Sequence, residues 1–153
     1  MCIVFDQPLF GATIVLHDGI TVSNITSRVS VYEDKQGALS FDDIRALQKS
    51  GKMQLADVQR LHFGLTDDVI WLHFRIEAPT DMEHDDWLLE FSNSRLDVLD
   101  VHLVQADQHL QTLKLGILRP ASVGDIAGRL PVIALLTKPN EAHDIYVRAK
   151  SVT

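Results

Sequence analysis

Hydrophobic residues along this chain occur mainly in short runs of about five to eight positions, separated by polar residues, glycine and proline. Runs of this length that are rich in β-branched and aromatic residues predict strands. Turn-forming clusters such as His17–Gly19, Ala78–Asp81 and Lys138–Asn140 lie between them. The predicted strands are Ala12–Leu16, Val29–Tyr32, Ile70–Ile76, Trp87–Phe91, Val98–Val104, Leu110–Leu115, Val132–Leu136 and Ile145–Ala149.

Many short strands at this spacing are typical of an antiparallel sandwich or barrel, whereas strands alternating with helices would indicate a parallel sheet. The predicted fold class is therefore all-β. The sequence contains no internal repeat and no linker that would divide it, and its 153 residues fit one compact unit. We expect residues 1–153 to form a single domain.

One segment has the signals of a helix instead. Ser40 precedes the predicted helix Phe41–Lys49, and Asp43 stands three residues after Ser40, as in a capping box with Asp in place of the usual Glu. Acidic residues in the first turn and Lys49 in the last turn suit the helix dipole. Gly51 provides a C-terminal stop.

Period-2 alternation divides the strand Ile70–Ile76 into an apolar side and an unusual outward side that carries Trp71, His73 and Arg75. Two further predicted strands continue this outward side with Asp100, His102, Tyr146 and Arg148. An aromatic platform flanked by planar hydrogen-bonding groups is the chemistry that sugars require. Arg119 and Arg129 could instead capture a carboxylate or a phosphate in a bidentate manner. The candidate ligand-binding residues are Trp71, His73, Arg75, Asp100, His102, Arg119, Arg129, Tyr146 and Arg148.

Two other interpretations of the same residues stay open. In the first they are structural: Trp71 covers a sheet edge or lies under a loop, and the arginines pair with Asp67, Asp97 or Asp100. In the second the outward face docks a second copy or a partner protein, because Trp and Arg are common interface anchors. A homodimer and a small ligand are therefore competing expectations.

No motif for catalysis or for a cofactor occurs: the sequence has no Gly-rich phosphate loop, nucleophile elbow or paired-histidine zinc motif. A metal could be held only across strands, for instance by His73, Asp100 and His102, and spacing gives no support for such a site. Carboxylates such as Glu90 and Asp97 could pair for glycoside hydrolysis, but any acidic chain offers such pairs. We predict no enzymatic role, no cofactor and no metal.

The charge balance of the chain excludes some classes of binding partner. The chain has 14 Lys and Arg against 21 Asp and Glu, a net charge of -7, and no basic cluster, which argues against nucleic acid and anionic lipid surfaces. No apolar run approaches the roughly 20 residues that span a membrane. The first residues lack the features of a signal peptide, so the chain taken literally is a cytoplasmic protein. Cys2 is the single cysteine and leaves the redox compartment open.

Several segments, in order, resemble one family. Val31–Asp34 with Gly37–Ile44 is similar to its opening "Y-x-D-x-x-G-x-L-T-x-x-D-V", and Phe63–Ile76 is similar to its "G-x-x-x-x-x-Y-W-L-R-F" strand. Trp87–Leu103 resembles "W-L-L-E-x-x-x-x-x-L-D-x-V-D-L-Y". The closing segments are matched by Gly116, Arg119-Pro120, Arg129–Val132 and Ile145–Ser151. The family is the second type of extracellular domain in seven-transmembrane receptors with diverse intracellular signalling modules.

The resemblance covers about residues 30–151 and implies a jelly-roll β-sandwich akin to carbohydrate-binding modules. It implies a periplasmic sensor domain, part of a longer membrane receptor with a diguanylate cyclase or histidine kinase output. This would replace the literal cytoplasmic interpretation. His102 stands where Tyr is usual and His73 where Arg is common, so the ligand cannot be carried over from relatives.

Overall fold

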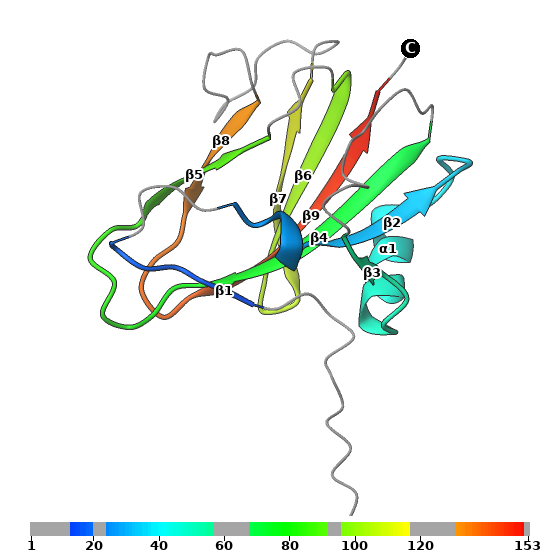
Figure 1. Ribbon diagram of the computed structural model, residues 1–153. Coiled ribbons are helices and arrows are strands. Elements are labelled where there is room, and N and C mark those ends of the chain that lie inside the picture. The colour runs from blue at the N-terminus through cyan, green and yellow to red at the C-terminus, as the bar shows by residue number, and fades with distance from the viewer. Residues whose placement is uncertain (1–12, 20–23, 57–67, 92–95, 117–130, 152–153) are drawn as a thin grey trace, which may run out of the picture.

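The computed structural model describes residues 13–19, 24–56, 68–91, 96–116 and 131–151, which are built mainly from strands (Figure 1). The elements in chain order are β1 (Ile14–Val15), the 3-10 helix η1 (Thr26–Arg28), β2 (Ser30–Asp34), α1 (Phe41–Lys49), β3 (Gln54–Leu55), β4 (Val69–Glu77), β5 (Asp86–Glu90), β6 (Val98–Gln105), β7 (Gln108–Leu115), β8 (Val132–Leu136) and β9 (Ala142–Lys150).

The strands form two sheets. Six strands of the larger sheet follow the order β3-β2-β4-β9-β6-β7. The seventh strand, β1, lies off this order and pairs in parallel with the end of β4. The other pairings in this sheet are antiparallel. The smaller sheet is the antiparallel pair β5-β8. The predicted all-β sandwich is confirmed, while the jelly-roll topology stays a prediction.

Both faces of the larger sheet are buried, each against a different element. On one face, Leu72, Phe74 and Ile76 of β4 belong to an apolar core that includes Ile133 and Leu135 of β8. On the opposite face of β4, Val69 and Trp71 join a second core with Ile44 of α1. Figure 1 shows the small sheet and α1 on the two sides of the large sheet. The molecule is thus a sandwich with a helix packed on its outer layer.

Helix α1 has the bounds and the caps that the sequence predicts. The Ser40 hydroxyl accepts from the Asp43 amide at 3.1 Å, and the Asp43 carboxylate accepts from the Ser40 amide at 2.9 Å. These two bonds satisfy amides that the first turn leaves free, and the bond from the Ser40 amide lowers the pKa of the Asp43 carboxyl. Gly51, at a φ of 71°, ends the helix in the left-handed region.

Two elements were absent from the prediction. η1 and β3 are each three residues or fewer, too short for a periodic pattern to reveal. Each of the predicted strands is present, with ends shifted by a few residues. The predicted strand at Ala12–Leu16 is reduced to Ile14–Val15 within the described residues.

Candidate functional site: an aromatic face covered by a helix

Cross-strand register brings most of the predicted site residues onto one face of the large sheet. Two rows cross β4, β9 and β6; the first holds Trp71, Arg148 and Asp100, and the second holds His73, Tyr146 and His102. Arg75 lies one row further on, opposite Asp144. The alternation predicted for β4, β6 and β9 is therefore confirmed. Arg119 and Arg129 lie outside the described residues.

The expectation that this face points outward to solvent is wrong for its centre. Trp71 is 1% exposed, Tyr146 3% and His73 4%. The reason is α1, which packs its one fully buried residue, Ile44, against Trp71 and Tyr146 in the second core. A sequence pattern shows which side of a strand a residue occupies, but it does not show which element then covers that side.

The covered face is an aromatic cluster. The Phe41 ring of α1 stacks on His102, with 4.1 Å between centroids and 10° between planes, and meets Tyr146 edge-on at 5.3 Å. Trp71 lies parallel to His102 at 6.0 Å, and His73 is tilted against Tyr146 at 4.6 Å. Stacked and edge-on pairs of this kind hold rings in defined orientations. We call these five residues the aromatic cluster.

Polar atoms inside the aromatic cluster lack partners. Trp71 Nε1 and His73 Nδ1 are buried and make no hydrogen bond with any described residue. Arg45 Nε of α1 is likewise buried and makes no hydrogen bond with any described residue. Leaving a buried donor or acceptor unpaired costs about 1–3 kcal/mol, so each such atom in a folded protein calls for a reason. Three of the four atoms of this kind in the described chain belong to α1 or to the face beneath it.

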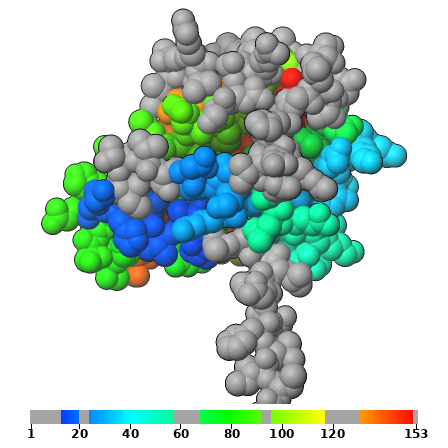
Figure 2. Space-filling model, viewed as in Figure 1, coloured from blue at the N-terminus to red at the C-terminus, as the bar shows by residue number. Residues whose placement is uncertain are grey.

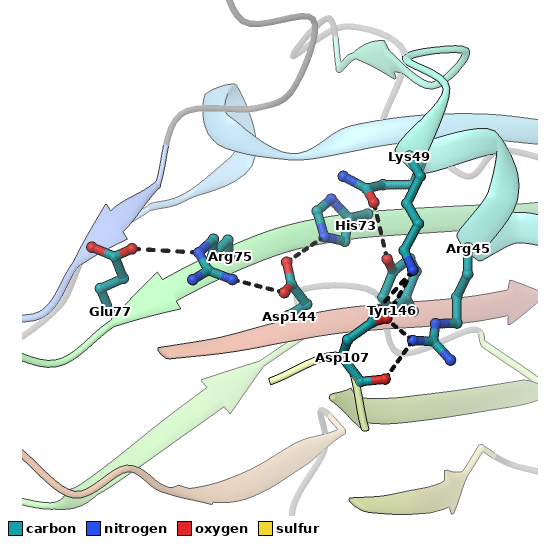
Figure 3. Close-up of polar contacts among 9 residues, drawn as sticks. Arg45, Lys49, His73, Arg75, Glu77, Asp107, Asp144 and Tyr146 are labelled. Atoms are coloured by element: carbon teal, nitrogen blue, oxygen red, sulfur yellow. Dashed lines mark hydrogen bonds and ion pairs between the residues drawn. The ribbon is translucent and has the colours of Figure 1, made fainter. Parts of the chain in front are cut away.

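A chain of ionic contacts runs from the aromatic cluster to the surface (Figure 3). His73 Nε2 lies 2.9 Å from Asp144 Oδ1, Arg75 Nη1 donates to Asp144 Oδ2 at 2.8 Å, and Arg75 Nε lies 3.4 Å from Glu77 Oε1. Burial by itself would raise the pKa of Asp144, but the hydrogen bond and charge of His73, together with Arg75, outweigh it and lower that pKa. An ionised Asp144 accepts from His73 Nε2–H, which leaves Nδ1 as the second ring nitrogen, buried and without a partner among the described residues.

A second ionic contact lies on the other side of the aromatic cluster. Arg148 Nη1 is 3.7 Å from Asp100 Oδ2, and both side chains are mostly buried. This is the pairing that the structural interpretation of the arginines expects. Asp100 and Arg148 therefore have a role in the sheet itself, whatever else they bind.

The turn between β6 and β7 holds α1 in place. Ala106 and Asp107 have φ values of 48° and 64°, which place the Asp107 carboxylate over the helix. Arg45 Nη2 donates to the Asp107 carbonyl and to its Oδ1, both at 2.7 Å, and Lys49 Nζ donates to Oδ2 at 3.0 Å. These partners lower the pKa of Asp107, Lys49 first and Arg45 second. Figure 3 shows both cations converging on Asp107. We call these contacts the Asp107 latch.

His102 is held in its neutral form. Burial, chiefly, lowers its pKa to about 4; His109, Lys114 and Arg148 act in the same direction and Asp100 opposes them. Its Nδ1 lies 2.9 Å from Thr112 Oγ1, which is also 2.9 Å from His109 Nε2. The stacking of His102 on Phe41 is therefore that of an uncharged ring at neutral pH.

Several residues of this site were not predicted: Phe41, Arg45, Asp107, His109 and Asp144. Asp144 could have been found, because it shares the alternation of Tyr146 and Arg148 along β9. The others come from α1 and from β7 and the turn before it, and no periodic signal in the sequence says that these meet over the sheet. No three His, Cys, Asp or Glu side chains in the described part of the chain are grouped as metal ligands would be.

A family model described as 7TMR-DISM extracellular 2 matches residues 26–153. No match was found among curated proteins. Within the described residues, no helix is both long and apolar enough to cross a membrane.

Proposed function

Because this chain belongs to the family of 7TMR-DISM extracellular 2 domains, the periplasmic sensor domains of seven-transmembrane receptors, we propose that it detects a small carbohydrate-like ligand at the aromatic cluster beneath α1. The receptor output is a diguanylate cyclase or a histidine kinase. The chain's own residues act in binding, and none is assigned a catalytic role.

One observation carries the choice of ligand. Trp71 Nε1 is a buried donor without a partner among the described residues, and His73 Nδ1, two residues along the same strand face, is a buried ring nitrogen without one. A hydroxyl group both donates and accepts a hydrogen bond, so an alcohol is the simplest group that satisfies both atoms. The aromatic rings beside them supply the flat apolar surface on which a sugar ring packs.

The charges of the site favour a neutral ligand over a small acid. Arg45, Arg75 and Arg148 each already contact a carboxylate, of Asp107, Asp144 and Asp100 respectively. An acidic ligand would have to displace one of these carboxylates, and the chain as a whole carries a net charge of -7. A neutral polyhydroxylated ligand can bond to the paired groups without separating them.

Binding requires α1 to move, and the contacts of the helix permit this. No backbone hydrogen bond among the described residues joins α1 to the sheet. The helix is held by Ile44, by the Phe41 stack, by the Tyr146 hydroxyl donating to Gln48 at 3.2 Å, and by the Asp107 latch. An element with few buried side chains opens at a lower free energy than the sheet below it. Figure 2 shows α1 together with β2 and β3, in light blue to turquoise, along one side of the described surface.

The alternative is a module that docks a second copy through the predicted outward face. A second copy could contact Trp71 and Tyr146 only if α1 left the whole face, whereas a small ligand needs a smaller opening beside the helix. The covered face thus supports the small-ligand proposal over the docking one.

Thermal shift and calorimetric titration with neutral oligosaccharides and with small carboxylic acids test the proposal. We expect a neutral sugar to raise the melting temperature in step with the logarithm of its concentration. Trp71→Phe keeps a ring but removes the indole N–H, and should abolish this shift. Trp87→Phe is the matched control, since Trp87 Nε1 is also buried and unpartnered but packs against the opposite, apolar core. The proposal fails if no neutral sugar binds, or if both variants bind as the parent does.

A further inference from the structure

A cavity lies on the other side of the large sheet, between the β6–β7 hairpin and the end of β8. Its volume is about 190 Å³, and its floor includes Ile76, Leu135 and Ile145, which are all buried. We propose that this cavity is a second binding site, independent of the aromatic cluster, for a small neutral amphiphile with an apolar chain or ring and one hydrogen-bonding end.

Its rim exposes apolar surface that a ligand would cover. Leu136 of β8 is 74% exposed and Leu110 of β7 is 55% exposed, and both line the cavity. Single exposed leucines are common, but these two come from different sheets and line the same hollow, whose other lining residues are mostly aliphatic. Covering that surface with an apolar group is favourable in proportion to the area removed from water.

A bulge directs one of these leucines to the rim. Leu103 of β6 pairs with Gln111 of β7, and the next β6 residue, Val104, pairs with His109, so Leu110 has no partner in the ladder. A bulge of this kind bends a strand and turns one side chain away from regular alternation. Leu110 thereby lines the cavity on the core side of the sheet, although its neighbour His109 contacts Phe41 on the α1 side.

The polar groups of the cavity select against a charged ligand. Thr137 and His143, both buried, and Gln111 supply a hydroxyl, an imidazole and an amide, and the described residues that line the cavity include no Lys, Arg, Asp or Glu. A charged head group would lose its hydration without finding a counter-charge. A carboxylate is disfavoured further because Glu141 Oε2 lies 3.4 Å from His143 Nε2. One alcohol or amide group suits these partners.

The volume sets the size of the apolar part. A dry cavity of about 150 Å³ is enough to hold benzene, so this one accommodates a chain or ring of about six carbons. The site is therefore too small for an oligosaccharide, which separates it from the ligand proposed for the aromatic cluster.

Methyl-labelled NMR titration with 1-hexanol tests the site on the whole chain. We expect saturable shifts of the Ile76, Leu135 and Ile145 methyl signals, no more than slight changes at Ile44 of α1, and much weaker binding of hexanoate. Leu136→Ser should weaken 1-hexanol binding about fivefold or more, since it removes a wall of the cavity. Leu88→Ser is the matched control, because Leu88 is 66% exposed on the same small sheet but does not line the cavity.

Ala134→Phe provides a second variant, which fills the mouth of the cavity without removing a core residue. It should also reduce binding. Shifts that stay linear with 1-hexanol concentration, equal effects of Leu136→Ser and Leu88→Ser, or equal binding of 1-hexanol and hexanoate would each overturn the proposal. None of these results bears on sugar binding by the aromatic cluster, which the Trp71→Phe and Trp87→Phe pair tests separately.

Discussion

The two faces of the large sheet are covered by different elements and differ in the chemistry that they bury. The face toward the small sheet is packed with aliphatic residues and Phe74, whose burial needs no hydrogen bond. The face toward α1 buries Trp71, Tyr146 and His73 and half-buries His102. The polar atoms of these side chains need partners, and two of them have none among the described residues. The first face makes the domain stable, while the second retains unsatisfied groups that suit a binding site.

The largest effect should come from the apolar face. Leu99 of β6 is fully buried in the first core, so Leu99→Ala should lower the free energy of unfolding by about 2–5 kcal/mol. Urea denaturation followed by fluorescence and by circular dichroism measures this loss. Both probes should report one transition, because this core belongs to the whole sheet. A loss well below 1 kcal/mol would show that this face does not dominate stability.

Ile44→Ala is the corresponding change on the other face and should act locally. Ile44 is the fully buried residue of α1, and its truncation should cost about 2–4 kcal/mol of helix docking. Hydrogen exchange should show the α1 amides losing protection while β4 and β9 keep theirs. If the strands lose protection to the same extent as α1, the helix is part of the main folding unit and not a separable cover.

The pH dependence of stability should report His102. Its pKa is about 4 in the folded protein and 6.5 in the unfolded chain, so between these values the unfolded chain binds the extra proton. The contribution of His102 to stability should therefore be constant above pH 6.5 and fall as the pH drops toward 4. The loss is on the order of 2 kcal/mol after allowing for solvent screening at this half-buried ring.

His102→Tyr keeps a ring that can stack on Phe41 and removes the titration. Urea denaturation at several pH values should show a flatter profile between pH 6.5 and 4 for this variant than for the parent. Because the pKa of Asp144 is lowered from its ordinary value of 3.8, protonation of Asp144 reduces stability mainly below that pH, outside this window. An unchanged slope in the variant would assign the pH dependence to another group.

The smallest effect should come from the Asp107 latch. Asp107 is exposed, so Asp107→Asn should change global stability little but raise hydrogen exchange in α1 at low salt. Added salt should reduce the difference between parent and variant, because it screens the charges of Arg45 and Lys49. Asp86→Asn, at an exposed position of β5 in the small sheet, serves as a control for the loss of one negative charge. Equal hydrogen exchange of the α1 amides in the parent and in Asp107→Asn would show that the Asp107 latch does not hold the helix.

Much of this architecture could be predicted from the sequence. The capping box places α1 at Phe41–Lys49, period-2 alternation separates Phe74 from His73, and the resemblance to the sensor family from about residue 30 is confirmed by a match over residues 26–153. Each of these signals depends on residues close together in sequence or on the order of motifs along the chain, so a single sequence is enough to recognise it.

The covering of the aromatic face could not be predicted. It depends on where α1 lies, and that depends on contacts between residues far apart in sequence, such as Arg45 with Asp107 and Gln48 with Tyr146. The same limit explains the error about solvent exposure: alternation assigned Trp71 to the correct side of β4, but only the packing of Ile44 shows that this side is buried.

The most direct test of the account is the indole N–H signal of Trp71 in ¹⁵N-labelled protein during titration with a neutral oligosaccharide. A saturable shift of the Trp71 signal, an unchanged Trp87 signal and altered exchange of the α1 amides at the same concentrations are the predicted result. A Trp71 signal that stays in place while the sugar binds elsewhere, or α1 protection that is unaffected by saturating sugar, would contradict a ligand site beneath the helix.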